Sequence, residues 1–311
     1  VVCPPLPLKR KKIKMKFALA SDLHLEFDTL ELNNTEGADV LVSVDPSRGI
    51  DSSSCNLAPP CRTIAHAVQS RNANIVYLVA GYFDESNIII NSSFSRVSII
   101  GLNGSSSTVI DCSLRSSPGP AFSIVNSSVS IAGITFQNCA NFDGLSGIGG
   151  AVSASDSSVA VSDCKFLNNT AQIGGAIGVK SSSLVVSSCI FENNTATCPN
   201  AASTVTACSA WGGAIGTAEA LTISVIGNSF SSNMVNLVLN AVTNSTSQAA
   251  GGGGCVSVIY NFNVSGSRVT VDGNVFEKCT VSMSGFNNLS LSSQGTVLVS
   301  GVQYGNTYGG A

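Results

Sequence analysis

Short apolar segments alternate with polar punctuation along most of the chain. A strand-like stretch at 74–83 precedes runs of three to five residues, each followed by Asn, Ser or Gly, at 88–90, 97–100, 108–110, 122–125 and 129–131. Strands this short do not form stable hairpins alone, but strands stacked coil on coil pair with equivalents about 4.8 Å away. We therefore expect an all-β solenoid.

One repeat organises the chain: a Gly-Gly pair with two small or aliphatic residues, followed by Phe and then Asn. The copies are Gly149-Gly150-Ala151-Val152 with Phe166, Gly174-Gly175-Ala176-Ile177 with Phe191, Gly212-Gly213-Ala214-Ile215 with Phe230, and Gly253-Gly254-Cys255-Val256 with Phe276. Glycine permits a tight corner and Asn tolerates left-handed backbone. We expect Phe191 to stack beneath Phe166, and Asn193 and Asn194 to close a turn where side-chain amides form a ladder.

The spacing of the repeat shows where the coil varies. The distance from the Gly pair to Phe is 17, 17, 18 and 23 residues, whereas the distance from Phe to the next Gly pair is 8, 21, 23 and 33. Insertions in solenoids collect on one face, commonly the functional one. We expect loops of unequal length at one corner, and a longer parent protein, because the chain ends at Gly309-Gly310-Ala311, the opening of another copy.

The segment at 43–74 differs from the repeats. It contains Cys55 and Cys61 and an amphipathic stretch at 63–68 that predicts a short helix, after which a strand leads to Gly81-Tyr82-Phe83. This arrangement resembles the N-terminal entrance of the pectin-lyase-like fold. The resemblance implies a right-handed parallel β-helix with a short N-terminal capping helix, in which residues 43–74 form the entrance and 75–311 the repeats.

The repeat itself resembles that of chlamydial polymorphic outer membrane proteins. The resemblance rests on Phe166-Leu167-Asn168-Asn169, Phe191-Glu192-Asn193-Asn194 and Phe230-Ser231-Ser232-Asn233. Passenger domains of that family are β-helical adhesins, and related repeats occur in large surface proteins of protists and algae. The resemblance implies an extracellular or cell-surface module, with carbohydrate or a surface protein as the candidate partner.

A different pattern opens the chain. Residues 1–11 are Pro-rich and then basic, which predicts a disordered segment. Residues 12–42 resemble the start of calcineurin-like metallophosphoesterases, in which a strand ends in Asp-x-His, here Asp22 and His24. That resemblance implies Asp22 and His24 as metal ligands.

The rest of that metal site is missing from the sequence. Ser43-Val44-Asp45-Pro46-Ser47 stands where the family has Gly-Asp-x-x-Asp, no Gly-Asn-His-Asp/Glu follows, and the second histidine, His66, lies in the predicted helix. Two ligands do not make a dinuclear catalyst. We interpret residues 12–42 as a fragment joined to an unrelated domain, and Asp22 and His24 as polar residues that end a strand.

The charge distribution and the lengths of the apolar runs argue against nucleic-acid binding and against a transmembrane segment. Charged residues make up 11% of the chain, the net charge is −3, and six of the fifteen basic residues lie between Lys9 and Lys16. Since no basic patch follows, the sequence argues against nucleic-acid binding. No apolar run approaches about eighteen residues, so no transmembrane segment is expected, and the N-terminus does not match a signal peptide.

Cysteines and glycosylation sequons point to an oxidising, secretory route. There are eleven cysteines without C-x-x-C spacing, and nine Asn-x-Ser/Thr sequons at Asn33, Asn91, Asn103, Asn126, Asn168, Asn193, Asn244, Asn263 and Asn288. Cys55 with Cys61, and Cys198 with Cys208, lie close enough in sequence to form disulfides. Cys164 and Cys189 share one repeat position, where either a disulfide or two inward thiols would fit.

Catalytic groups are sparse in the repeat region. Polysaccharide lyases and glycoside hydrolases of this fold use clustered charged side chains, but Asp111, Asp143, Asp156, Asp163 and Asp272 are scattered singly. Lys165, Lys180, Arg268 and Lys278 have no carboxylate set, and Asp156 with Lys180 is interpreted as a solvated surface pair. We expect a non-enzymatic module without cofactor. The alternatives are a carbohydrate-active enzyme of this fold and, less favoured, a metallophosphoesterase.

Overall fold

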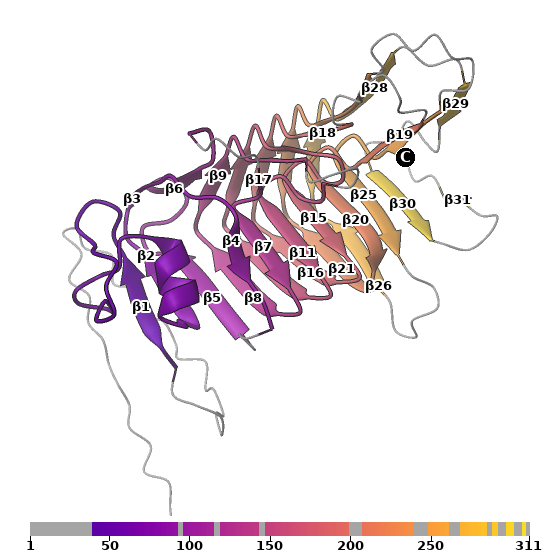
Figure 1. The fold of residues 1–311 in the computed structure, drawn as a ribbon. Coiled ribbons are helices and arrows are strands. Elements are labelled where there is room, and N and C mark those ends of the chain that lie inside the picture. The colour runs from indigo at the N-terminus through magenta and orange to yellow at the C-terminus, as the bar shows by residue number, and fades with distance from the viewer. Residues whose placement is uncertain are drawn as a thin grey trace, which may run out of the picture. The chain divides into compact units, whose positions relative to one another are not determined.

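The computed structural model describes a parallel β-helix (Figure 1). It describes residues 39–92, 96–114, 119–142, 147–198, 207–238, 248–260, 268–284, 288–291, 297–301 and 307–308, all within the unit Asp39–Ala311. The predicted disordered segment 1–11, the fragment strands before residue 39, and Asp22 and His24 lie outside these residues.

Three long sheets form the sides of the coil, each built from equivalent strands of successive turns. Sheet A contains β1 (Leu41–Val44), β2 (Ile75–Leu78), β5 (Arg96–Gly101), β8 (Ser128–Ala132), β12 (Ser158–Ser162), β16 (Ser183–Ser187), β21 (Thr222–Ile226) and β26 (Arg268–Asp272). Sheet B contains β3 (Gly81–Phe83), β6 (Thr108–Asp111), β9 (Thr135–Gln137), β13 (Lys165–Leu167), β17 (Ile190–Glu192), β22 (Ser229–Ser231) and β27 (Val275–Glu277). Sheet C contains β4 (Ile88–Ile90), β7 (Phe122–Val125), β11 (Val152–Ser155), β15 (Ile177–Lys180), β20 (Ile215–Ala220), β25 (Val256–Tyr260), β30 (Val297–Gly301) and β31 (Thr307–Tyr308).

Two smaller sheets occupy the corner between sheets B and C. Sheet D contains β10 (Ala140–Asn141), β14 (Thr170–Ala171), β18 (Thr195–Thr197), β23 (Met234–Val238) and β28 (Thr280–Ser284). Sheet E contains β19 (Ala207–Trp211), β24 (Gln248–Gly252) and β29 (Asn288–Leu291). A complete coil therefore runs from sheet A through B and D to C. The described strands pair in parallel with their neighbours, except for β30 with β31, and one isolated antiparallel bridge joins Gly119 to Ala140.

Side chains along each strand point alternately into the coil and toward the solvent. In β12, Val159 and Val161 point inward and are buried, and they pair in register with Leu184 and Val186 of the next coil. Because successive side chains of a strand point to opposite faces, the five-residue strands of sheet A contribute two inward residues, whereas three-residue strands such as β13 and β17 contribute one. Equivalent positions then stack into one continuous core from coil to coil.

The aromatic stack predicted from the repeat is present. Phe136, Phe166, Phe191, Phe230 and Phe276 lie in consecutive coils, with neighbouring ring centroids 5.1, 4.8, 4.7 and 4.9 Å apart and ring planes within 15° of parallel. The strand separation sets this distance, because the rings repeat with the coil. The first four rings are fully buried, so the stack fills the centre of the core.

The amide ladder is also confirmed, one residue after a left-handed turn. Asn193 has a φ of 56° and is exposed, whereas Asn194 is fully buried. The Asn194 side chain donates to the carbonyl of Phe166 (2.9 Å) and to Oδ1 of Asn233 (2.9 Å), and its Oδ1 accepts from the backbone N–H of Asn169 (3.1 Å). A second ladder joins Asn228 to Asn274.

We expect Asn194→Leu to lower the free energy of unfolding by about 2 kcal/mol, since it removes the buried side-chain hydrogen bonds to Phe166, Asn169 and Asn233 and leaves the backbone N–H of Asn169 without its acceptor. Urea denaturation followed by circular dichroism measures the change. Asn193→Gly is the matched control, because it keeps the left-handed turn and alters only an exposed side chain. An equal loss in both variants would contradict a structural role for the ladder.

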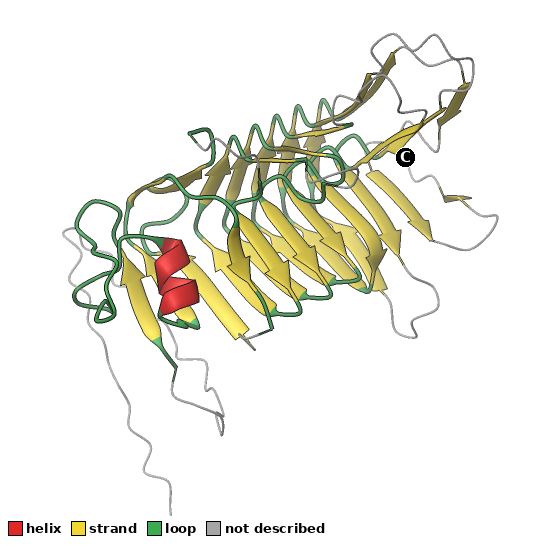
Figure 2. Ribbon diagram, viewed as in Figure 1, coloured by secondary structure: helices red, strands yellow, loops and turns green. Residues whose placement is uncertain are grey.

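The entrance segment contains the predicted helix, as η1 (His66–Ser70), which packs against β1 and β4 (Figure 2). The carboxylate of buried Glu85 accepts hydrogen bonds from the N–H groups of Ile64 and Ala65 where the helical turn begins. A helical segment is thus present, overlapping the predicted 63–68 in part, and its role as a cap stays a prediction. The boundary predicted between residues 42 and 43 falls inside β1, which pairs with β2 as the first strand of sheet A.

Candidate functional site

The corner between sheets D and C is where the coils differ most, as the repeat spacing predicts. In each of four coils the first glycine of the Gly-Gly pair has a φ of 66–67°, at Gly149, Gly174, Gly212 and Gly253. The residues just before it, Ile148, Ile173 and Trp211, pair as isolated parallel bridges. The Gly-Gly corner therefore has the same structure in each coil, whereas the segment that connects sheet D to it differs in length.

Inserted chain at this corner forms sheet E. Gln172 and Ile173 link β14 to the corner directly, whereas β19 and β24 are inserted in the following coils (Figure 1). These two strands pair in register from Ala207 with Gln248 to Trp211 with Gly252. We call the strands β18, β23 and β28 of sheet D, together with the three strands of sheet E, the flange.

The flange has a small hydrophobic cluster separate from the main core. Ala196, Val235 and Leu237 of sheet D pack with Ala210 of sheet E, and all four are fully buried. A side chain at Gly251 would lie 2.6 Å from Leu237 Cδ1, so the two sheets approach closely. The strands of sheet E were not predicted, since loops were expected at this corner. Their Ala, Gly and Ser residues carry little strand signal.

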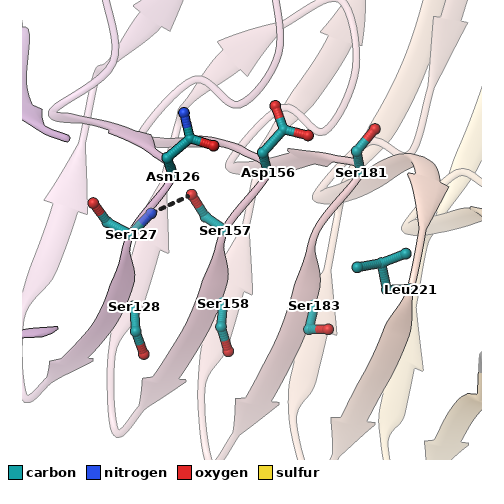
Figure 3. Close-up of a pocket in the computed structure, with 9 residues that line it drawn as sticks. All are labelled: Asn126, Ser127, Ser128, Asp156, Ser157, Ser158, Ser181, Ser183 and Leu221. Atoms are coloured by element: carbon teal, nitrogen blue, oxygen red, sulfur yellow. Dashed lines mark hydrogen bonds between the residues drawn. The ribbon is translucent and has the colours of Figure 1, made fainter. Parts of the chain in front are cut away.

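A second feature is a shallow groove along the corner between sheets C and A (Figure 3). It encloses about 460 Å³ and is lined by Asn126, Ser127, Ser128, Asp156, Ser157, Ser158, Ser181, Ser183 and Leu221. Inside this row, Ser157 Oγ accepts from the N–H of Ser127, and Ser182 Oγ accepts from the N–H of Ser157. Asp156 is the one carboxylate in the lining, so the groove offers hydrogen bonds but no acid and base pair.

The acidic residues singled out in the sequence do not converge on this groove. Asp156 and Asp163 occupy exposed turns with φ of 51° and 53°, and Asp156 forms no ion pair with Lys180. Asp272 is exposed at the end of β26, and Asp143 lies outside the described residues. Their exposed, separate positions favour the interpretation of these residues as polar surface residues over the interpretation as a catalytic set.

Asp111 lies in a polar cluster on the outside of sheet B. Its carboxylate accepts from Gln137 Nε2 (2.7 Å) and Asn138 Nδ2 (3.1 Å), and Gln137 also donates to the hydroxyl of exposed Tyr82. Burial alone would raise the pKa of Asp111, but these hydrogen bonds and those from Ser113 outweigh it and lower the pKa. A lowered pKa keeps this carboxylate ionised at neutral pH and unsuited to general-acid catalysis.

One grouping of three potential metal ligands occurs in the part of the chain that the structure describes. It consists of Cys55, Cys61 and His66. The two sulfurs form a disulfide, as predicted, with a Cα–Cα distance of 5.0 Å, so they offer no thiolate to a metal. The sequence-based metal candidates Asp22 and His24 cannot be placed beside it, because they lie outside the described residues.

Two further disulfides were not predicted. They join Cys112 to Cys139 and Cys255 to Cys279, with Cα–Cα distances of 4.7 and 5.3 Å. Cys139 and Cys279 occupy the repeat position that Asn169, Asn194 and Asn233 fill in the coils between them, three residues after Phe. Cys198 is disulfide-bonded, but the side chain of Cys208 lies outside the described set, so that pairing stays a prediction.

Cys164 and Cys189 are buried free thiols, which decides between the two alternatives left by the sequence. Each thiol donates to the carbonyl two residues before it, at 3.1 and 3.2 Å. Burial raises the pKa of Cys164 well above its usual value, and the neighbouring Cys189 raises it further. Thiolate is the reactive form, so the raised pKa disfavours reaction at Cys164, and burial shields both thiols from reagents in solution.

We expect neither thiol to react with a chromogenic disulfide reagent in the native protein at pH 8, and both to react in urea. Mass spectrometry of the labelled peptides measures this for each cysteine. Rapid labelling of Cys164 or Cys189 without denaturant would show that the coil opens locally.

In the described residues there is no helix long and apolar enough to cross a membrane. No protein-family model matches the chain. No curated protein and no solved structure matches it either.

Proposed function

We propose that this protein is a non-enzymatic extracellular or cell-surface β-helix module with a structural or adhesive role, and that the flange is its contact surface. The observation that carries the proposal is the flange itself. Chain inserted at one corner of an otherwise constant coil has formed the strands of sheet E, and Ala210 of this sheet completes a buried cluster with Ala196, Val235 and Leu237 of sheet D. A solenoid does not need such strands to close its coils.

The disulfides support an extracellular location. The bonds from Cys55 to Cys61, Cys112 to Cys139 and Cys255 to Cys279 would be reduced in most cytosolic environments. The resemblance of the repeats to those of surface adhesins agrees with this location. The resemblance to the entrance of pectin-lyase-like proteins adds carbohydrate as the first class of ligand to test.

Deletion of residues 198–210 tests the contact surface. It joins Thr197 to Trp211, which reproduces the direct link that Gln172 and Ile173 make in the preceding coil. It also removes both local cysteines and all of β19 except Trp211. We expect the shortened protein to keep its circular dichroism spectrum and to lose at least about tenfold in affinity for immobilised matrix glycoproteins or polysaccharides that the intact chain binds.

The control shortens the same corner outside the flange, by deleting residues 143–146, and is expected to bind normally. If the intact chain binds nothing on the panel, or binds equally well without β19, the proposal is wrong. Depolymerisation of any polysaccharide on the panel would favour the carbohydrate-active enzyme. Binding of Mn²⁺ or Fe with cleavage of a generic phosphodiester would favour the metallophosphoesterase, the third hypothesis.

A further inference from the structure

Among the described residues, exposure separates the sequon asparagines from the buried asparagines. The sequon asparagines whose exposure the structure describes are all exposed: Asn91, Asn103, Asn126, Asn168 and Asn193. The buried asparagines all lie outside sequons: Asn141, Asn169, Asn194, Asn228 and Asn233. Ser- and Asn-rich composition alone would not separate the two groups in this way.

Asn168 and Asn193 form the most regular pair. They occupy the same turn of adjacent coils, each with a φ of 56°, directly after the paired residues Leu167 and Glu192. Their side-chain amides make no hydrogen bond to the described protein, whereas the next residues, Asn169 and Asn194, form the buried ladder. The fold thus uses the second Asn of each pair and leaves the amide of the first free.

The threonines of these two sequons are not explained by the fold. Thr170 and Thr195 are partly exposed, and neither hydroxyl donates to or accepts from another described group. The equivalent position is Ala140 in the preceding coil and Met234 in the following one. A hydroxyl is therefore dispensable for the coil, while it is the feature that an Asn-x-Thr acceptor requires.

We propose that Asn168 and Asn193 are N-glycosylation sites, an inference that rests on the proposed extracellular location. The side-chain amide nitrogen of each Asn bonds to the anomeric carbon of an oligosaccharide carried on a lipid pyrophosphate. The bond from that carbon to the pyrophosphate oxygen breaks, the nitrogen loses one proton, and the lipid pyrophosphate leaves. The two glycans then project from neighbouring coils, about 4.8 Å apart at their attachment points, at the turns that precede β14 and β18.

The test uses the full chain, secreted from cultured eukaryotic cells behind an added signal peptide. Enzymatic deglycosylation in heavy-oxygen water, which labels each formerly glycosylated Asn as Asp, is expected to label Asn168 and Asn193. Thr170→Val and Thr195→Val should each remove one glycan from the intact mass. Thr280→Val is the matched control, because Thr280 occupies the same repeat position, whereas Lys278, two residues before it, stands where the sequons have Asn.

Absence of the label from Asn168 and Asn193 in secreted, disulfide-bonded protein would overturn the inference. That result leaves the proposed function intact if the same protein binds the glycoprotein and polysaccharide panel. Conversely, labelled asparagines in a protein that binds nothing would retain the glycosylation sites and reject the adhesive role. Loss of a glycan in Thr280→Val would show that the valine variants act through misfolding rather than through the sequon.

Discussion

Phe191→Ala is expected to lower the free energy of unfolding by about 4 kcal/mol. Phe191 is fully buried, and its ring lies 4.8 Å from that of Phe166 and 4.7 Å from that of Phe230. Removing the ring leaves a cavity between two aromatic faces that the coil spacing holds apart. Because backbone hydrogen bonds fix that spacing, the neighbouring rings cannot close the gap.

Urea denaturation followed by circular dichroism measures this loss. Phe276→Ala provides the control, since Phe276 is only partly buried and contacts a stacked ring on one side within the described residues. We expect roughly half the destabilisation there. A Phe191→Ala loss no larger than that of Phe276→Ala would mean that stacking contributes little to the core.

Gly175→Ala is expected to destabilise the coil by about 3 kcal/mol or more, because the added methyl group has no space. A Cβ at this position would lie 2.1 Å from the carbonyl oxygen of Gly213 and 2.6 Å from the backbone nitrogen of Thr195. Both obstacles are backbone atoms of the next coil, which cannot rotate away as a side chain would. The substitution therefore forces neighbouring coils apart at the corner.

Gly104→Ala is the control for Gly175→Ala, because it introduces backbone strain without steric crowding. Gly104 has a φ of 75°, but no atom lies within 4 Å of the position that a Cβ would take. It should cost about 1 kcal/mol through its left-handed backbone alone. If thermal denaturation showed equal losses for the two variants, close packing of the Gly-Gly corner would not be the reason for its glycines.

The repeats could be predicted because identical neighbours recur in register. The Phe rings stack on each other, and so do the ladder asparagines Asn169, Asn194 and Asn233. Residues at the same position of each repeat therefore stack on one another in successive coils. The position of the variable corner followed from the same spacing.

The disulfides from Cys112 to Cys139 and from Cys255 to Cys279 could not be predicted from the repeat, because the equivalent positions in the other coils are not cysteines. Cys139 takes the place of a ladder Asn, and Cys255 takes the place of Ala214 in the preceding coil. Pairing such residues requires knowledge of which coils are adjacent and how insertions shift the register. Sequence distance predicted two pairs, of which Cys55 with Cys61, six residues apart, is confirmed and Cys198 with Cys208 stays a prediction.

The sequence by itself determined the parallel coil, the stacked rings, the amide ladder and the corner that accepts insertions, since each depends on short motifs whose neighbours are copies of themselves. Only the tertiary structure decided that the inserted chain forms the flange, because β19 and β24 become strands through pairing with each other across coils. It also decided which asparagines remain free. Asn168 and Asn169 differ only in the face of the turn on which the backbone places them.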